Sequence, residues 1–269
     1  AAAERGAYLV RAGGCVSCHT AEGGGTFAGG RALATPFGTF FSPNITPDRE
    51  TGIGAWSDDQ FVRALREGVR PDGAHYFPVF PYTAYTRMTR ADALAMKAYL
   101  FSLAPVARPN RDHEIDFPFG WRLLQAGWKL LFFDAGEQVP DPARSPQWNR
   151  GAYLVEALAH CGECHTRRNV FGALDRDMWL AGTVDGPDGA FVPNITPDAE
   201  TGIGGWSEGD IVQLLKIGFK PDFDDVQGTM AEAIEDGLKH LTDADLEAIA
   251  AYLRALAPIR NPIAPQPRE

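Results

Sequence analysis

Apolar residues recur at helical spacing in two long segments, and capping residues mark the ends of both. Ser57 and Ser207 each follow a tryptophan and stand before acidic residues and an apolar-periodic run. A serine hydroxyl in such a place accepts a hydrogen bond from an amide that the first helical turn leaves unpaired. The runs reach Gly68 and Gly218, and glycine commonly closes a helix. The pattern therefore predicts one helix over 57–68 and another over 207–218.

Two further helices are predicted to begin at threonines. Thr89 and Thr242 each start a T-x-x-D pattern, which is typical of helix N-termini. Pro105 and Pro258 end the two runs, because proline does not continue a helix. The two predicted helices carry apolar residues at Leu94, Ala98 and Leu100, and at Leu246, Ile249 and Leu253.

Three blocks of sequence occur twice in the same order. In the first block an apolar-periodic segment leads into a cysteine motif, near residue 4 and again near residue 148, and predicts one more helix in each copy. The second block is rich in glycine, and its two copies differ at only two positions. The blocks are GAYLVRAGGCVSCHT (6–20) and GAYLVEALAHCGECHT (151–166), NITPDRETGIGAWS (44–57) and NITPDAETGIGGWS (194–207), and TRADALAMKAYLFSLAP (89–105) and TDADLEAIAAYLRALAP (242–258). The repetition predicts two copies of one small all-helical domain.

The predicted boundaries are an N-terminal domain over 1–106, a linker over 107–147 and a C-terminal domain over 148–269. Within the linker, residues 117–133 read FPFGWRLLQAGWKLLFF and predict a helix. Arg122, Gln125 and Lys129 share one face of this helix, and large apolar residues fill the rest. The simpler interpretation is a helix packed between the domains. The alternative is a docking surface for another subunit or for a membrane surface.

The composition is that of a globular protein, with 45% hydrophobic residues and a net charge of −10 over 269 residues. A chain this acidic lacks the basic face that nucleic acid requires, and it favours a basic or neutral protein partner. No apolar run is long enough for a transmembrane helix. The opening AAAERG is consistent with a mature exported chain after cleavage of a signal peptide.

Two C-x-x-C-H motifs, at 15–19 and 161–165, carry the most specific chemistry in the sequence. This motif is the attachment signature of c-type haem. The thiols of Cys15 and Cys18, and of Cys161 and Cys164, reach the two vinyl groups of a porphyrin, and His19 and His165 bind the irons. A thioredoxin-like redox pair, half of a zinc site and structural disulfides are the competing interpretations. A histidine directly after the second cysteine, twice, favours two covalently attached haem c groups.

Methionine is the expected sixth ligand of an electron-transfer haem, because methionine opposite histidine raises the potential. Met230 stands in a loop twelve residues before Thr242 and is predicted to bind the second iron. For the first iron we expect Met88, which precedes the helix cap, with His75 or an open iron as alternatives. Met96, on the periodic face of its helix, and Met178 are expected to pack in the core.

Trp56 and Trp206 end the glycine-rich blocks. We expect each to pack at a haem edge and to donate its indole N–H to a propionate, and a plain core position is the alternative. Pro43 and Pro193 precede the same blocks, and their carbonyl groups are candidates to accept from the second ring nitrogen of His19 and His165.

Taken together, these motifs resemble the diheme cytochromes c that are electron-acceptor subunits of periplasmic alcohol and gluconate dehydrogenases. The resemblance rests on both C-x-x-C-H motifs, both NITPD blocks, the loop FPVFPYTAYTRM and the segment GTMAEAIEDG. It covers nearly the whole chain and implies two tandem class I cytochrome c domains. Some members also carry a third haem domain and a membrane anchor, and neither is expected here. Some carry methionine within the proline-rich loop as F-P-x-M-P, where this chain has Phe80.

The resemblance implies a periplasmic electron carrier between a dehydrogenase donor and a cytochrome or oxidase acceptor, without catalysis of its own. A two-haem peroxidase is the alternative from another class, and it requires one iron with an open or displaceable ligand. A thiosulfate-oxidising enzyme is disfavoured because no cysteine is left over as a ligand. A redox or gas sensor is disfavoured because no signalling domain is visible.

Overall fold

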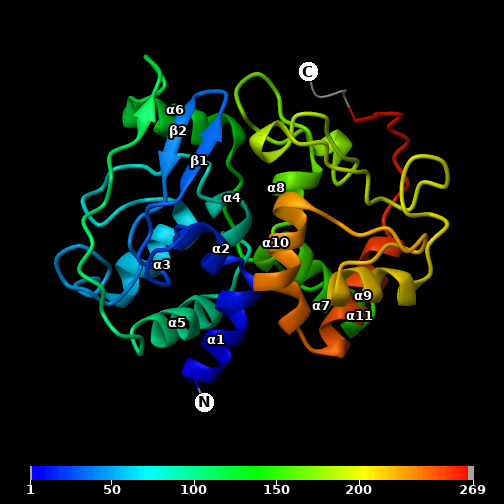
Figure 1. Ribbon diagram of the computed structural model, residues 1–269, viewed down its shortest axis with the longest axis horizontal. Helices are drawn as coiled ribbons and strands as arrows, with labels where there is room; N and C mark the ends of the chain where they lie inside the picture. Colours follow the sequence, from blue (N-terminus) through cyan, green and yellow to red (C-terminus); the bar gives the residue numbers. More distant parts are fainter. Residues whose placement is uncertain (1, 266–269) are drawn as a thin grey trace. The chain divides into compact units, whose positions relative to one another are not determined.

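The computed structural model describes residues 2–265 and divides the chain into two compact units, 1–138 and 139–269. Both units are mostly helical, as the sequence pattern predicts (Figure 1). Among the described residues, no helix has the length and apolar character needed to cross a membrane. The elements of unit 1 are α1 (Ala2–Ala12), α2 (Cys15–His19), β1 (Ala32–Thr35), β2 (Gly38–Phe41), α3 (Asp58–Glu67), α4 (Tyr82–Tyr85), α5 (Arg90–Leu100), β3 (Glu114–Ile115) and α6 (Arg122–Phe132).

Unit 2 repeats the order of α1, α3 and α5 of unit 1, and its described residues contain no counterpart of the sheet or of α6. It differs by a π-helical turn (Leu154–Leu158) and by three short 3₁₀ turns (Arg176–Met178, Pro187–Gly189 and Leu238–His240). Its helices are α7 (Pro146–Tyr153), α8 (Gly162–His165), α9 (Glu208–Ile217), α10 (Gly228–Asp236) and α11 (Asp243–Arg254).

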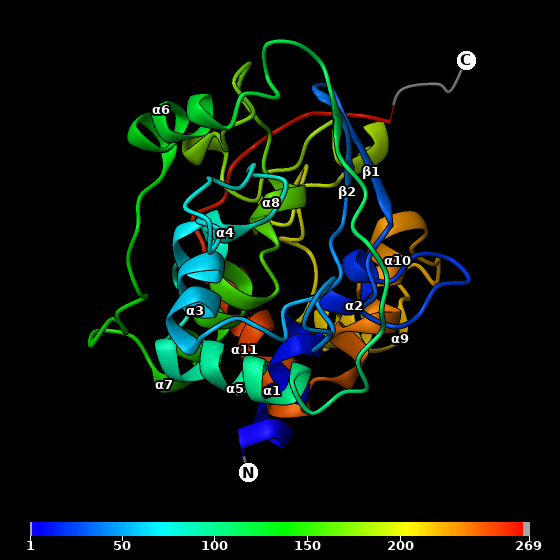
Figure 2. The ribbon, with the colours of Figure 1, turned by 90° about the vertical axis from the view of Figure 1, so that its left-hand side faces the viewer.

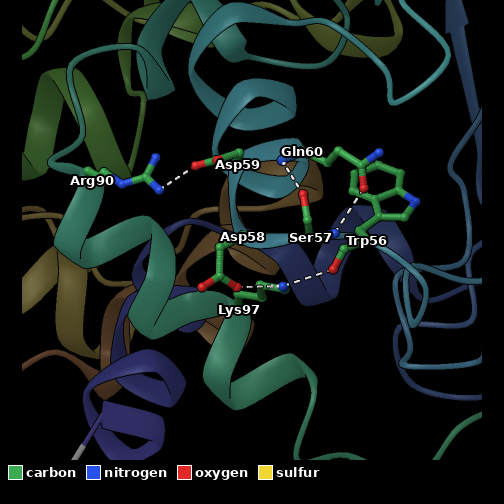
Figure 3. Close-up of polar contacts among 7 residues, drawn as sticks. All are labelled: Trp56, Ser57, Asp58, Asp59, Gln60, Arg90 and Lys97. Atoms are coloured by element: carbon green, nitrogen blue, oxygen red, sulfur yellow. Dashed lines mark hydrogen bonds and ion pairs between the residues drawn. The ribbon is translucent and has the colours of Figure 1, made fainter.

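The serine-capped helices form where the sequence predicts them. The Ser57 hydroxyl accepts from the Gln60 amide at 3.2 Å, and the Gln60 side chain accepts from the Ser57 amide at 2.9 Å (Figure 3). This reciprocal pair satisfies two amides at the start of α3. Ser207 closes the same arrangement on α9. Gly68 (φ 60°) and Gly218 (φ 78°) end the two helices in the left-handed conformation that glycine tolerates best.

The threonine-capped helices are confirmed too. Thr89 accepts from the Asp92 amide at 3.1 Å, and Thr242 accepts from the Asp245 amide at 3.2 Å. Helix α5 ends at Leu100 and α11 at Arg254, several residues before the prolines that were expected to stop them.

Each unit is built on a close crossing of its first helix with its threonine-capped helix. Helix α1 packs on α5, and α7 packs on α11. A Cβ atom added to Gly6 would stand 1.9 Å from the Ala95 carbonyl oxygen, and one on Gly151 would stand 1.9 Å from the Ala248 carbonyl oxygen. Only glycine fits there, which explains the first residue of the repeated GAYLV sequence. An ion pair accompanies each crossing, Arg5–Asp92 in unit 1 and Arg150–Asp245 in unit 2.

Unit 1 also contains a small antiparallel sheet, which the helical prediction did not include. The strands β1 and β2 pair through Ala32↔Phe41 to Thr35↔Gly38 and lie side by side in Figure 2. Strand β3 adds to the other edge of β2 through Gly38↔Ile115. These strands are too short to show an alternating pattern, and β3 reaches β2 from far along the chain.

Residues 107–138 of the segment predicted as a linker are part of unit 1. The Lys129 ammonium group on α6 donates to the carbonyls of Glu67 (2.5 Å) and Gly68 (2.7 Å) at the end of α3. Such a contact satisfies carbonyls that the last turn of a helix leaves unpaired. The Arg122 guanidinium donates to the His75 carbonyl at 2.8 Å. The two cations of the predicted polar face therefore hold α6 on its own unit.

Acidification is expected to weaken the packing of the segment around His113 on the rest of unit 1. The His113 Nδ1 accepts from the Phe41 amide at 3.1 Å, and its ring packs on Phe40 and Phe77. Burial and then the Arg122 charge hold the pKa of His113 below its usual value. The folded state therefore binds fewer protons here than the unfolded state. The contribution of neutral His113 to the free energy of unfolding is complete above about pH 6.5. It is lost as the pH falls below that value.

Chemical denaturation of the wild type and of His113→Asn between about pH 7 and pH 5 tests this expectation. The variant keeps an acceptor but does not titrate, so its unfolding free energy should fall less steeply with acid. Parallel pH profiles for the two proteins would contradict the role given to His113.

Candidate haem-binding sites

Each cysteine motif forms a single helical turn that follows a residue with left-handed backbone. Helix α2 comes directly after Gly14 (φ 63°), and Cys161 caps α8 directly after His160 (φ 41°). On one turn of helix, residues three apart lie on the same side. The two thiols of each motif therefore face the same region, as attachment to one porphyrin requires.

Unit 2 has one more residue than unit 1 between the GAYLV sequence and its first cysteine. A π-helical turn absorbs that residue, with the Ala159 amide donating to the Leu154 carbonyl at 2.7 Å. A π-helical turn is how a single insertion is usually accommodated in a helix. The insertion therefore leaves α7 in its place and brings Cys161 to the position that Cys15 has in unit 1.

Both motif histidines point one ring nitrogen at a proline carbonyl. The distance from His19 Nδ1 to the Pro43 oxygen is 2.7 Å, and that from His165 Nδ1 to the Pro193 oxygen is 2.8 Å. A carbonyl only accepts, so Nδ1 carries the proton and Nε2 keeps its lone pair. Burial lowers the pKa of both histidines, which favours the neutral ring. This is the form that binds iron, and the predicted proline contacts are confirmed.

Two glycines that the sequence analysis did not single out join each histidine to its proline. The Gly29 amide donates to the His19 carbonyl at 2.8 Å, and the Gly182 amide donates to the His165 carbonyl at 2.7 Å. A Cβ on Gly29 would approach the Pro43 carbonyl carbon to 2.4 Å. Both glycines have positive φ, so the close approach and the backbone conformation each require glycine.

Buried asparagines hold the proline segments, and they too were missed. Asn44 donates to the Val106 carbonyl at 2.7 Å and accepts from the Thr46 amide at 2.9 Å. Asn194 makes the same two bonds in unit 2, to the Ile259 carbonyl (2.7 Å) and from the Thr196 amide (2.9 Å). Asn44 therefore ties the segment after Pro43 to the chain that follows α5, and Asn194 ties the segment after Pro193 to the chain that follows α11. Their position in the repeated NITPD block was the available signal.

Trp56 and Trp206 are half-buried in equivalent turns, each amide donating to an isoleucine carbonyl at 2.9 Å. Figure 3 shows the Trp56 carbonyl accepting from Lys97 on α5, at 2.9 Å. Lys97 also pairs with Asp58 at 2.7 Å, which joins α5 to the start of α3. Arg254 donates to the Trp206 carbonyl in unit 2. Contact of either indole with a haem propionate stays a prediction.

The four methionines fall into two groups by burial. Met88 and Met96 are fully enclosed, with 0% and 1% of their surfaces exposed. Met230, in the first turn of α10, and Met178, in a 3₁₀ turn, are half-buried. The loop expected around Met230 is therefore a helix, and the side chain keeps some exposed surface that a bound group could cover. Its role and that of Met88 stay predictions.

The cysteine surroundings fit thioether chemistry better than the alternatives. Burial raises the pKa of the Cys15 and Cys161 thiols to about 12, with the neighbouring cysteine adding to the effect. Such thiols are not poised as thiolate nucleophiles. Among residues 2–265, no group of three or more histidine, cysteine, aspartate or glutamate side chains is arranged to hold a metal ion. The zinc interpretation therefore lacks its remaining ligands, whereas a haem iron takes four of its ligands from the porphyrin.

Comparison with known proteins also indicates haem attachment at the cysteine motifs. The Cytochrome c family profile matches residues 3–104. A diheme cytochrome c-type protein of Cereibacter sphaeroides is 43% identical over 96% of this chain and 86% of its own length. The fructose dehydrogenase cytochrome subunit of Gluconobacter japonicus is 44% identical over 94% of the chain. The gluconate 2-dehydrogenase cytochrome c subunit of Pantoea cypripedii is 42% identical over 94% of the chain.

These relatives differ in how much of their length the chain spans. It covers 52% of the Gluconobacter subunit and 59% of the Pantoea subunit, but most of the Cereibacter protein. The match to the Cereibacter protein, the two oriented histidines and the two cysteine turns lead to one conclusion. The chain belongs to the diheme c-type cytochromes and carries two covalently attached haem c groups.

Proposed function

We propose that this chain accepts electrons from a periplasmic dehydrogenase and passes them to a downstream cytochrome or oxidase. The observation that carries the proposal is the pair of matched histidines, each with its Nδ1 directed at a proline carbonyl. A haem so held supplies one-electron chemistry, and the protein sets its orientation and potential. The names of the relatives, cytochrome subunits of fructose and gluconate dehydrogenases, suggest the class of donor.

The architecture that we propose is two tandem class I cytochrome c domains, related by duplication. The shared helix crossings at Gly6 and Gly151 support it, as do the matched bonds of Asn44 and Asn194. The π-helical turn supports it further, because it absorbs the one extra residue of the second copy. We propose that the haem-binding part of the first domain ends near 106 and that of the second begins near 148, with residues 107–138 packed on unit 1.

Three side chains carry the proposed ligation. His19 and His165 bind the two irons through Nε2, since Nδ1 is engaged by the prolines. Met230 binds the second iron through its sulfur, in keeping with its partial exposure in α10. Trp56 and Trp206 lie at the ends of the segments that hold the histidines, and we propose them as propionate contacts.

We propose no catalytic role for the chain itself. The relatives are named as cytochromes or cytochrome subunits, which gives no support to the peroxidase alternative. The partners that we propose are the donor and acceptor proteins. The exposed side of α6 is a candidate docking surface, because Leu123, Leu130 and Leu131 expose 83%, 89% and 75% of their surfaces. Its two cations bind unit 1, so this side offers little charge to anionic lipid.

Reduction by a dehydrogenase tests the proposal directly. The oxidised, haem-loaded chain is mixed with fructose, gluconate or alcohol dehydrogenase freed of its own cytochrome subunit, and haem reduction is followed optically. We expect reduction that requires both enzyme and substrate with at least one of the three. Reduction by dithionite alone, with no response to any dehydrogenase, would remove the proposed donor class. Fractionation of the native host tests the periplasmic location.

A further inference from the structure

The two units share a hydrogen-bonded loop that sets the register of the segment after α3 or α9. In unit 1 the Arg70 amide donates to the Ala74 carbonyl, and the Tyr76 amide donates to the Gly68 carbonyl, both at 2.8 Å. In unit 2 the Lys220 amide donates to the Asp224 carbonyl at 2.8 Å, and Val226 donates to Gly218 at 3.0 Å. Tyr76 and Val226 are therefore equivalent positions in the two loops.

Counting onward along the chain from Tyr76 and from Val226 places Phe80 where unit 2 has Met230. Counting back from the helix caps gives another phenylalanine, because the residue twelve before Thr89 is Phe77, just as Met230 stands twelve before Thr242. The segment is longer in unit 2, so the two counts differ. Neither count leads to Met88.

Met88 instead matches Leu241. Each stands directly before a capping threonine, and each amide donates at 3.0 Å to the carbonyl three residues earlier, Tyr85 or Leu238. Met88 exposes 0% of its surface and Leu241 exposes 4%. Leucine does not bind iron, so the position serves the core in unit 2. The same burial gives Met88 the same role in unit 1.

Other side chains near this loop that could be considered as iron ligands are engaged in other interactions. His75 Nδ1 lies 3.0 Å from the Lys129 ammonium group, which donates to it, so the other ring nitrogen of a neutral His75 carries the proton. Burial raises the pKa of Tyr76 to about 12, which disfavours a phenolate ligand. The Tyr85 hydroxyl donates to the Gly13 carbonyl at 2.7 Å. Met96 lies within α5 and is enclosed.

We propose that the iron of the first haem has no methionine ligand and that its sixth position takes a small neutral molecule such as carbon monoxide. This rests on the proposed histidine ligation. Two equivalent positions carry the proposal. Phe80 stands where unit 2 has Met230, and Met88 stands where unit 2 has Leu241. The ring of Phe80 packs against those of Tyr76 (5.2 Å) and Tyr85 (5.9 Å). Aromatic neighbours favour a neutral diatomic molecule over an anion, because an anion is costly to bury among them.

Three variants of the haem-loaded chain test the proposal: Phe80→Met, Met88→Leu and Met230→Leu. The first readout is the long-wavelength absorption band that ferric haem shows with a methionine sulfur. Wild type should show it for one haem per chain, Met88→Leu should leave it unchanged, and Met230→Leu should abolish it. Phe80→Met should double the band. The second readout is carbon monoxide bound by the dithionite-reduced protein, which should be one per chain in wild type and in Met88→Leu.

Loss of half the band in Met88→Leu would overturn the proposal, and so would a wild-type chain that binds no carbon monoxide. If the Phe80→Met side chain does not reach the iron, the other two variants and the amount of carbon monoxide bound still decide whether the first iron has a methionine ligand. These spectra need no partner protein. A failure here is therefore distinct from a failure of the dehydrogenase experiment.

Discussion

Replacing both Cys161 and Cys164 with alanine is expected to halve the covalently bound haem and to unfold unit 2. The thioether bonds are lost, and the buried His165 then has no tethered iron to bind. A group that binds only the folded state stabilises it, so its loss lowers the stability of the unit that holds it. Haem content after denaturing gel filtration, together with far-ultraviolet circular dichroism on heating, gives both results.

The matched control is the pair Cys15→Ala and Cys18→Ala, which should leave the second haem attached and the first absent. The two double variants together show whether each motif holds its own haem. A full haem content in either variant would contradict the assignment of that motif.

Replacing Gly151 with valine is expected to destabilise unit 2 by about 3 kcal/mol, at the upper end of overpacking effects, because the clash is with backbone. The first added atom alone would stand 1.9 Å from the Ala248 carbonyl oxygen, so α7 and α11 have to separate. For a unit of this size the melting temperature should fall by roughly 10 °C. Differential scanning calorimetry of the haem-loaded protein measures this.

Gly127→Ala is the matched control, because a Cβ on this α6 residue would meet nothing within 4 Å. Alanine favours the helix over glycine by about 1 kcal/mol, so this change should be neutral or stabilising. Equal melting temperatures for Gly151→Val and wild type would show that the helices do not cross as closely as described.

The capped helices and the haem-attachment turns could be predicted from the sequence because their signals are local. Ser57, Gly68 and Thr89 act on amides and carbonyls within a few residues of themselves. The orientation of His19 by Pro43 could be anticipated because ligand histidines commonly donate their second ring nitrogen to a backbone acceptor.

Features that depend on distant partners were missed. Asn44 bonds the carbonyl of Val106, and β3 joins the sheet from a segment read as a linker. The sequence around Asn44 does not identify Val106 as its partner, and the sequence around β3 does not identify β2 as its partner. The Met88 prediction used closeness to a helix cap, whereas the register that favours Phe80 as the counterpart of Met230 comes from backbone hydrogen bonds. The sequence pattern alone does not reveal those bonds.

The most direct test of two tethered haem c groups is the intact mass of the mature protein under denaturing conditions, after expression in a host that attaches c-type haem. A mass that exceeds the polypeptide by two haem groups, in a single species that absorbs visible light, is predicted. A mass equal to the bare polypeptide, or to the polypeptide with one haem, would contradict it.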